Sequence, residues 1–269
     1  MDLLIIFAAL FLLILYLTLP GRPARQQNEP FQYRYFAHRG LYQNGSPAPE
    51  NSLPAFAAAA RAGYGVELDV QLSRDGQVVV FHDDTLDRVC GVQGRVDAFT
   101  LEELQAMPLL NSSEVMPLFS QVLEVLDGVP VIVELKSGPR NPELCQKTLE
   151  LLRAARGPYC VESFDPTVVA WFRRHAPRIL RGQLTGSAAS FPRLSRPRAW
   201  LLSRCMGNFL ARPQFIAWGA GRKNWVVKLV ECMGPARVHW TAHETDDQNA
   251  LQLEYDSIIF EGYEPPVRW

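Results

Sequence analysis

Short runs of β-branched and aromatic residues alternate with longer helical patterns along most of this 269-residue chain, and this alternation limits its fold more than any other feature. In the helical segment 52–62, Asn51 or Ser52 can cap the first turn and Gly63 can end the last one. Repeated strand–helix units predict a parallel sheet with helices outside it. The candidate strands are 33–37, 66–70, 78–82, 131–135, 160–163, 179–184, 215–218, 237–241 and 257–261.

Nine candidate strands within residues 33–269 fit a (β/α)8 TIM barrel with one strand in excess, and we assign 215–218 as the marginal one. An open doubly wound sheet is the alternative, but no G-x-G-x-x-G or Walker sequence follows any candidate strand. With 48% hydrophobic and 20% charged residues, the chain can bury a core of this size. We therefore expect a single α/β barrel domain over residues 33–269.

An apolar run precedes this pattern. Residues 3–19 carry no charge, and their span of about 26 Å is close to that of a thin hydrocarbon core. We predict that residues 1–20 form a transmembrane anchor, because a cleaved signal peptide would begin with basic residues and Asp2 is acidic. Arg22 and Arg25 follow the run, so the positive-inside rule places the barrel domain of this single-pass protein in the cytoplasm. Residues 21–32 are predicted to be a linker.

Carboxylates collect where the candidate strands end, which is where barrel enzymes place their catalytic groups. Glu67 and Asp69 are two residues apart on one strand and so share a face, and Glu134 and Lys136 have the same spacing. Such a pattern can also belong to the solvent-exposed face of an antiparallel sheet. Carboxylates that point into a barrel mouth repel unless a cation neutralises them, and oxygen donors without cysteine suit Ca²⁺ or Mg²⁺ rather than zinc.

Two histidines accompany these carboxylates. His38 and Arg39 follow the first candidate strand, and His82 ends the third. A histidine pair can supply an acid and a base near neutral pH, and Arg39 and Lys136 add positive charge for an anionic substrate. Together with a metal, this set describes phosphoryl-ester chemistry. We assign the Asp83-Asp84 pair to a turn, where aspartate is favoured.

Spaced motifs in this order carry a resemblance to a known family. They are His38-Arg39-Gly40, Pro49-Glu50-Asn51-Ser52, Val66-Glu67-Leu68-Asp69-Val70, Val80-Phe81-His82-Asp83, Thr85-Leu86-Asp87-Arg88, Val133-Glu134-Leu135-Lys136, Glu162-Ser163-Phe164-Asp165-Pro166 and Trp240-Thr241. The chain resembles the glycerophosphodiester phosphodiesterases over nearly all of residues 33–262. That family has the phospholipase-C-like β/α barrel, which agrees with the strand pattern.

The resemblance implies roles for the matching residues. A divalent cation, Ca²⁺ or Mg²⁺, would be held by three carboxylates, Glu67, Asp69 and Glu134. The catalytic acid/base pair would be His38 and His82. Contacts to phosphate or substrate would come from Arg39, Lys136, Glu50 and Trp240.

The implied reaction hydrolyses a glycerophosphodiester to sn-glycerol 3-phosphate and an alcohol. Two alternatives stay open: a lysophospholipase D-type activity on membrane lysophospholipids, and a catalytically dead barrel that binds phospholipid headgroups. An intact histidine pair argues against the second alternative. The chain departs from the family pattern at 240–243 and 259–262, which leaves headgroup specificity open, together with the roles of His243 and Glu261.

The formal net charge of −1 hides a basic segment. Residues 166–230 contain twelve of the 27 basic residues and none of the 28 acidic ones. We predict either an interfacial element against anionic lipid headgroups or an ordinary amphipathic helix packed on the barrel. A nucleic-acid partner is not expected, because no binding motif accompanies the charge.

Overall fold

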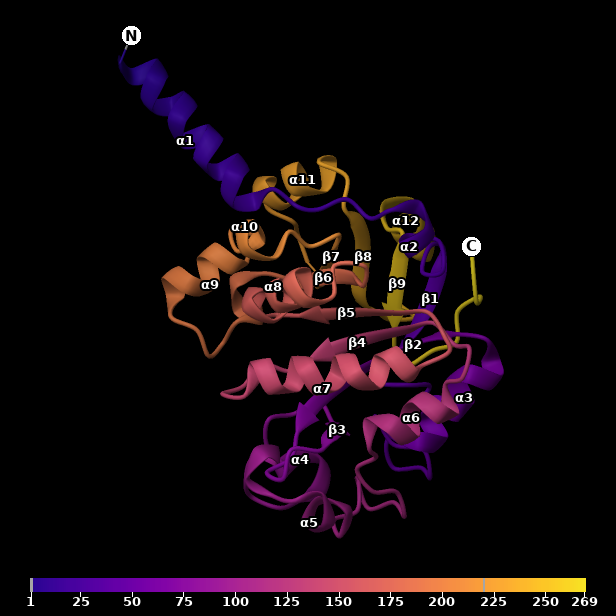
Figure 1. Ribbon diagram of the computed structural model, residues 1–269. Helices are drawn as coiled ribbons and strands as arrows, with labels where there is room; N and C mark the ends of the chain where they lie inside the picture. The colour runs from indigo at the N-terminus through magenta and orange to yellow at the C-terminus, as the bar shows by residue number, and fades with distance from the viewer. Residues whose placement is uncertain (1, 220) are drawn as a thin grey trace.

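A closed barrel of eight parallel strands forms the centre of the computed structural model, which describes residues 2–219 and 221–269 (Figure 1). The sheet runs from β1 through β9 to β4 and β2, and pairing of β1 with β2 closes it, with Phe36 opposite Gly65. The open doubly wound alternative is therefore excluded. The barrel strands are β1 (Arg34–His38), β2 (Gly65–Leu72), β4 (Val131–Leu135), β5 (Tyr159–Ser163), β6 (Leu180–Thr185), β7 (Phe215–Gly219), β8 (Ala236–Ala242) and β9 (Ser257–Phe260).

The prediction that 215–218 is the marginal strand is wrong, because β7 pairs in parallel with both β6 and β8. The strand outside the barrel is β3 (Val78–Val80), which pairs antiparallel with β2. A tight turn joins the two strands, and Gly76 takes a φ of +78° there. A connection this short produces a hairpin, whereas parallel neighbours need a crossover.

Helices surround the barrel and cover the apolar outer face of its strands (Figure 1). They include α3 (Leu53–Ala62), α6 (Phe119–Val125), α7 (Asn141–Ala154), α8 (Pro166–His175), α9 (Arg196–Leu202), α11 (Trp225–Cys232) and α12 (Gln248–Glu254), together with the four-residue α10 (Asn208–Ala211). Local signals set their ends as expected. At α3, the Ser52 hydroxyl accepts from the Ala55 amide, and Gly63 ends the helix with a φ of +86°.

The side chains inside the barrel are apolar toward one end of the strands and charged toward the other. Aromatic and aliphatic side chains from alternate strand positions, including Phe36, Ile132 and Phe215, pack together toward the N-terminal ends. Gly182 leaves room for the Phe215 ring, because a Cβ at this position would lie 2.0 Å from that ring. Toward the C-terminal ends, the same-facing positions of β2 and β4 carry buried carboxylates instead. The fold therefore gathers polar groups at one rim of the barrel.

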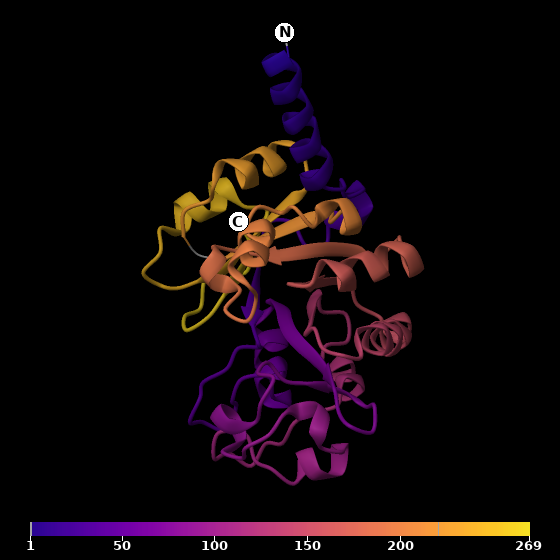
Figure 2. The same ribbon diagram turned by 90° about the vertical axis from the view of Figure 1, so that its left-hand side faces the viewer.

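An insertion after β3 forms a small lobe with its own apolar core. It contains α4 (Asp87–Cys90), the 3-10 turn Val96–Ala98 and α5 (Leu101–Gln105). Both views place it at the end of the molecule opposite helix α1 (Figures 1 and 2).

The predicted transmembrane anchor and single-pass cytoplasmic topology are wrong. Helix α1 (Asp2–Thr18) has 17 residues, and within residues 2–219 and 221–269 no helix is long and apolar enough to cross a membrane. At about 1.5 Å per residue it spans roughly 26 Å, against a hydrocarbon core of about 30 Å. The helix ends before Leu19-Pro20, where proline disfavours a helical predecessor. Its last turn contacts α10, where Asn208 Nδ2 donates to the Thr18 carbonyl at 2.9 Å.

Residues 21–32 include the short helix α2 (Arg25–Asn28), and Phe31 is buried with the barrel-interior cluster. The basic segment 166–230 is distributed over α8, β6, α9, α10, β7 and α11 rather than forming one surface helix. Some of its arginines bind the end of α10: Arg173 donates to the Leu210 carbonyl at 2.9 Å, and the buried Arg181 donates from Nε to the Ala211 carbonyl at 3.3 Å. These contacts stabilise the C-terminus of α10, whose free carbonyls attract cations.

Candidate active site

Three buried carboxylates meet at the C-terminal rim of the barrel. Glu67 and Asp69 lie on β2, Glu134 lies on the neighbouring β4, and Asp69 is in register with Glu134. One oxygen of each residue lies within 4.8 Å of the others. Strand periodicity brings these groups together, as the sequence predicts. We call them the carboxylate trio.

The trio is short of positive charge. The Lys136 ammonium lies 2.9 Å from Asp69 and 2.8 Å from Glu134, and its charge holds the pKa of Asp69 well below the usual range although burial opposes this. Glu67 lacks that contact, so burial, together with the charges of Asp69 and Glu134, raises its pKa well above the ordinary value. A hard divalent cation would offset the repulsion among these buried carboxylates, and an all-oxygen donor set suits Ca²⁺ or Mg²⁺. The trio therefore fits such an ion.

His38, at the end of β1, is paired with a carboxylate. Its Nδ1 lies 2.6 Å from Glu261 Oε2, which also accepts from the Tyr42 hydroxyl at 3.2 Å. The hydrogen bond from His38 outweighs burial and lowers the pKa of Glu261 to about 2. An ionised carboxylate only accepts, so Nδ1 carries the hydrogen and Nε2, 3.8 Å from Glu67, faces the trio with its lone pair.

His82 has the same arrangement. Its Nδ1 lies 2.6 Å from Asp83 Oδ1, and the Arg88 Nε donates to Asp83 Oδ2 at 2.7 Å. Burial would raise the pKa of Asp83, but hydrogen bonds with His82 and Arg88 hold it well below its usual range. Asp83 therefore orients His82 in addition to the turn predicted at Asp83-Asp84. Asp84 also does more than turn the chain, because it forms an ion pair with Arg193.

Arg39 is held at the rim by Glu50. Arg39 Nη1 donates to Glu50 Oε1 at 2.7 Å, and Arg88 binds both oxygens of the same carboxylate at 2.7 Å. Burial would raise the pKa of Glu50, but hydrogen bonds from Arg88 and the charge of Arg39 lower it to about 2. Glu50 thus lies outside the trio. It links Arg39 through Arg88 and Asp83 to His82, in one chain of charged hydrogen bonds.

The turn after β1 explains why arginine and glycine follow His38. Arg39 and Gly40 adopt φ values of +56° and +83°. Helix α3 passes so close that a Cβ on Gly40 would lie 2.9 Å from the Ala55 backbone. Only glycine fits at position 40, and this close approach delivers Arg39 to the rim.

Several residues of the site were missed by reasoning on the sequence. Asn51 is buried and donates from Nδ2 to Asp69 Oδ2 at 2.9 Å, which orients one trio carboxylate. Asn51 and Arg88 do lie in the motifs that carry the family resemblance, so a signal for them existed. Tyr42 lies outside those motifs, and the role of Glu261 stayed open on the sequence, because only barrel closure brings Glu261 to His38 and Tyr42.

Trp240 and His243 lie outside the carboxylate trio and the two histidine–carboxylate pairs. Trp240, on β8, donates from Nε1 to the Ala217 carbonyl at 3.1 Å, and its ring packs edge-on against Phe164 with centroids 5.6 Å apart. Trp240 therefore supports the wall beside the site rather than joining the trio. His243 is 53% exposed, with Nε2 3.9 Å from the Glu261 carboxylate.

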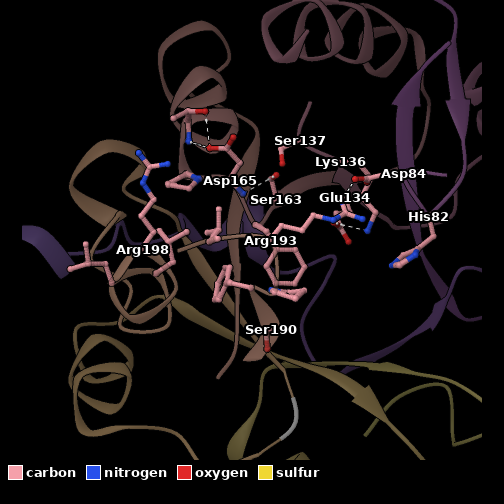
Figure 3. A pocket seen from close by; sticks show the side chains of 18 of the residues that line it. His82, Asp84, Glu134, Lys136, Ser137, Ser163, Asp165, Ser190, Arg193 and Arg198 are labelled. Carbon is pink, nitrogen blue, oxygen red and sulfur yellow. Dashed lines mark hydrogen bonds and ion pairs between the residues drawn. The ribbon is translucent and has the colours of Figure 1, made fainter. Parts of the chain in front are cut away.

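A pocket of about 680 Å³ opens beside the trio. His82, Glu134 and Lys136 lie at one end of it and Arg198 at the other (Figure 3). This volume is within the range of small-molecule sites.

A β/α barrel with its polar groups at the C-terminal rim has the arrangement of barrel enzymes. A sequence model of the Glycerophosphoryl diester phosphodiesterase family matches residues 38–261, and the chain belongs to that family.

Similar proteins agree with this assignment. A glycerophosphodiester phosphodiesterase of Bacillus altitudinis is 33% identical over 165 residues, which is 56% of this chain and 66%, slightly less than two thirds, of that protein. A probable glycerophosphodiester phosphodiesterase 2 of Mycobacterium tuberculosis is 28% identical over 83% of this chain and 85% of its own length. The structure of an Oleispira antarctica phosphodiesterase in complex with the product sn-glycerol-3-phosphate has the same fold, with a TM-score of 0.67 and 24% identity over 85% of this chain and 93% of that one.

Proposed function

We propose that residues 33–269 form a phosphoric diester hydrolase that converts a glycerophosphodiester to sn-glycerol 3-phosphate and an alcohol. The observation that carries this proposal is the carboxylate trio flanked by two histidines, each with a carboxylate 2.6 Å from its Nδ1. Family membership supports the same reaction. A module that only binds headgroups has no need of two histidines poised in this way.

Glu67, Asp69 and Glu134 would hold a divalent cation, Ca²⁺ or Mg²⁺. When bound, such an ion stabilises the negative charge that develops on a non-bridging phosphate oxygen.

The histidines move the protons. The Glu261 carboxylate accepts from His38 Nδ1, which leaves Nε2 to exchange a proton with the substrate, and Asp83 does the same for His82. One histidine, neutral with Nε2 free, accepts the proton of the attacking oxygen, which belongs to water or to the glycerol hydroxyl. The other starts as the imidazolium, with hydrogen on both ring nitrogens, and donates its Nε2 proton to the leaving alkoxide, so that a neutral alcohol departs.

Arg39 and Lys136 neutralise the substrate phosphate. Glu50 holds the Arg39 guanidinium, and Lys136 already bridges Asp69 and Glu134 at the rim. Both cations are partly buried, where charge interactions are stronger than in water. The anion is thus bound by groups that need little reorganisation.

The test is a substrate panel on the purified full-length chain, scored by release of sn-glycerol 3-phosphate. Glycerophosphocholine, glycerophosphoethanolamine and a phosphomonoester are compared with and without chelator, and Ca²⁺ or Mg²⁺ is then restored. We expect diester turnover that stops with chelator and returns with metal. His38→Ala or His82→Ala should lower kcat by about 10² to 10⁴ while the circular dichroism spectrum is retained. A folded protein that turns over neither glycerophosphodiester with either ion would overturn the proposal and leave the lysophospholipase D and headgroup-binding alternatives.

A further inference from the structure

The pocket beside the trio has an apolar wall that the proposed chemistry does not use. Beyond His82, Glu134 and Lys136, much of its lining carries no charge (Figure 3). The aromatic and leucine side chains that line it are Phe164, Phe191, Leu194, Leu201 and Leu202, which we call the apolar wall.

The inner part of the wall is formed by packed aromatic rings. The Phe164 ring packs edge-on against both Phe191 and Trp240, with centroid distances of 5.6 Å each. Phe191 is only 6% exposed, so it anchors the connection between β6 and β7 to the barrel. Edge-on aromatic pairs of this kind contribute about 0.5–1.5 kcal/mol beyond the area that they bury.

The outer part of the wall faces open space. Leu194 is 37% exposed and Leu201, on α9, is 41% exposed, and both line the pocket. Apolar surface in a concave site stays in contact with water until a ligand covers it. A small polar diester bound at the trio would leave this apolar surface exposed to water.

An ion pair connects the segment that carries the wall with the rim beside the trio. Arg193 precedes Leu194 and binds Asp84, which lies on the rim next to the His82–Asp83 pair. The connection between β6 and β7 is thereby joined to the β3 side of the pocket. An apolar group attached to a phosphate at the trio could therefore lie along the wall, because both line the same pocket.

On the basis of the proposed function, we infer that this pocket binds the hydrocarbon chain of an amphipathic glycerophosphodiester whose phosphate lies at the trio. The apolar wall then selects for chain-bearing substrates over chain-free ones. The pocket is continuous with the catalytic end, so the occupant is part of the substrate itself. The chain is carried either on the glycerol, as an acyl ester, or on the leaving alcohol.

The test compares kcat/KM for two substrate series, both kept below their micelle concentrations and assayed with metal. The first runs from glycerophosphocholine to lysophosphatidylcholines with short acyl chains of increasing length. The second consists of sn-glycerol 3-phosphate esters of straight-chain alcohols. We expect kcat/KM to rise by about fourfold for each buried methylene in one series, which identifies the side that carries the chain. Values that do not rise in either series overturn the inference.

Variants of the exposed leucines give an independent readout. Leu194→Ser with Leu201→Ser should lower the ratio of kcat/KM for the longest chain to that for glycerophosphocholine by about tenfold. Leu253→Ser is the matched control, because Leu253 is 87% exposed on α12 and does not line the pocket. It should keep the wild-type ratio. A wild-type ratio in the double variant contradicts a chain-binding wall.

A binding measurement separates this inference from the proposed function. Calorimetry with monomeric alkylphosphocholines of increasing chain length reports on the wall without turnover. Affinity that rises with chain length in a protein inactive on every diester supports the wall and rejects the hydrolase. Turnover of glycerophosphocholine without chain dependence in rate or affinity supports the hydrolase and rejects the wall.

Discussion

His38 Nδ1 and Glu261 Oε2 lie 2.6 Å apart although 223 residues separate them in the chain. His38 ends β1, and Glu261 directly follows β9, its parallel neighbour in the closed barrel. The first and last barrel strands therefore build one functional unit together. The pair resembles in its logic the histidine–carboxylate pairs that orient a general base.

Replacing Glu261 with glutamine should slow the reaction without preventing substrate binding. The amide cannot hold His38 in the required tautomer as the carboxylate does, so we expect kcat to fall by about 10- to 100-fold with little change in KM. Steady-state kinetics on glycerophosphocholine measures this. Tyr42→Phe, which removes only the 3.2 Å contact to Glu261, is the control and should retain most of kcat. Equal losses in the two variants would contradict a role for the carboxylate in positioning His38.

Divalent cations should stabilise the folded chain through the trio. The raised pKa of Glu67, caused by burial and by its neighbours Asp69 and Glu134, indicates an unmet need for positive charge. At a metal concentration 100 times Kd we expect about 2.7 kcal/mol of added stability, measured as a rise in Tm. Glu67→Gln should lose most of this response. Glu124→Gln, on the exposed face of α6, should respond as the wild type does; a similar response in both variants would place the ion elsewhere.

Gly182→Ala should destabilise the barrel from within. The new methyl group would lie 2.0 to 2.4 Å from the Phe215 ring, which is itself fully enclosed. Overpacking of this kind costs about 1–3 kcal/mol, which urea unfolding can measure. Gly138→Ala is the matched control, since a Cβ there meets nothing within 4 Å. If Gly138→Ala lost as much stability as Gly182→Ala, backbone effects rather than the contact with the Phe215 ring would explain the destabilisation.

Acid should destabilise the fold partly through His239. Burial lowers its pKa from 6.5 to about 4, while Asp246 opposes and Lys223 adds to the shift. The unfolded chain takes up this proton below pH 6.5 and the folded chain only near pH 4. Stability is therefore intact above pH 6.5 and falls by about 3 kcal/mol as the pH drops to 4.

Urea unfolding at pH 7 and pH 4.5 provides the measurement for this prediction. His239→Gln has no proton to gain, so its stability should depend less on pH than that of the wild type. An identical pH dependence in the two proteins would assign the acid sensitivity to other groups.

Local patterns in the sequence were sufficient to predict the barrel and the residues of the trio. Alternation of strands and helices predicts parallel strands, and a spacing of two places Glu67 and Asp69 on one face. These relationships depend on neighbours in the chain or on adjacent strands, so periodicity alone captures them. The same reasoning failed for 215–218 and for β3. Short parallel and short antiparallel strands have similar sequences, and only their pairing partners distinguish them.

Other features were decided only by the tertiary structure. Barrel closure brings Glu261 to His38, and folding of the inserted lobe brings Arg88 to Glu50 and Asp83. Hydropathy alone predicted a membrane span at the N-terminus, yet the length of α1 is set by where the helix ends, at Thr18. Composition and spacing thus determined which groups are available to this protein. The register of strands distant in the chain decided which of them meet, because hydrogen bonds only a few ångströms long depend on how the barrel closes.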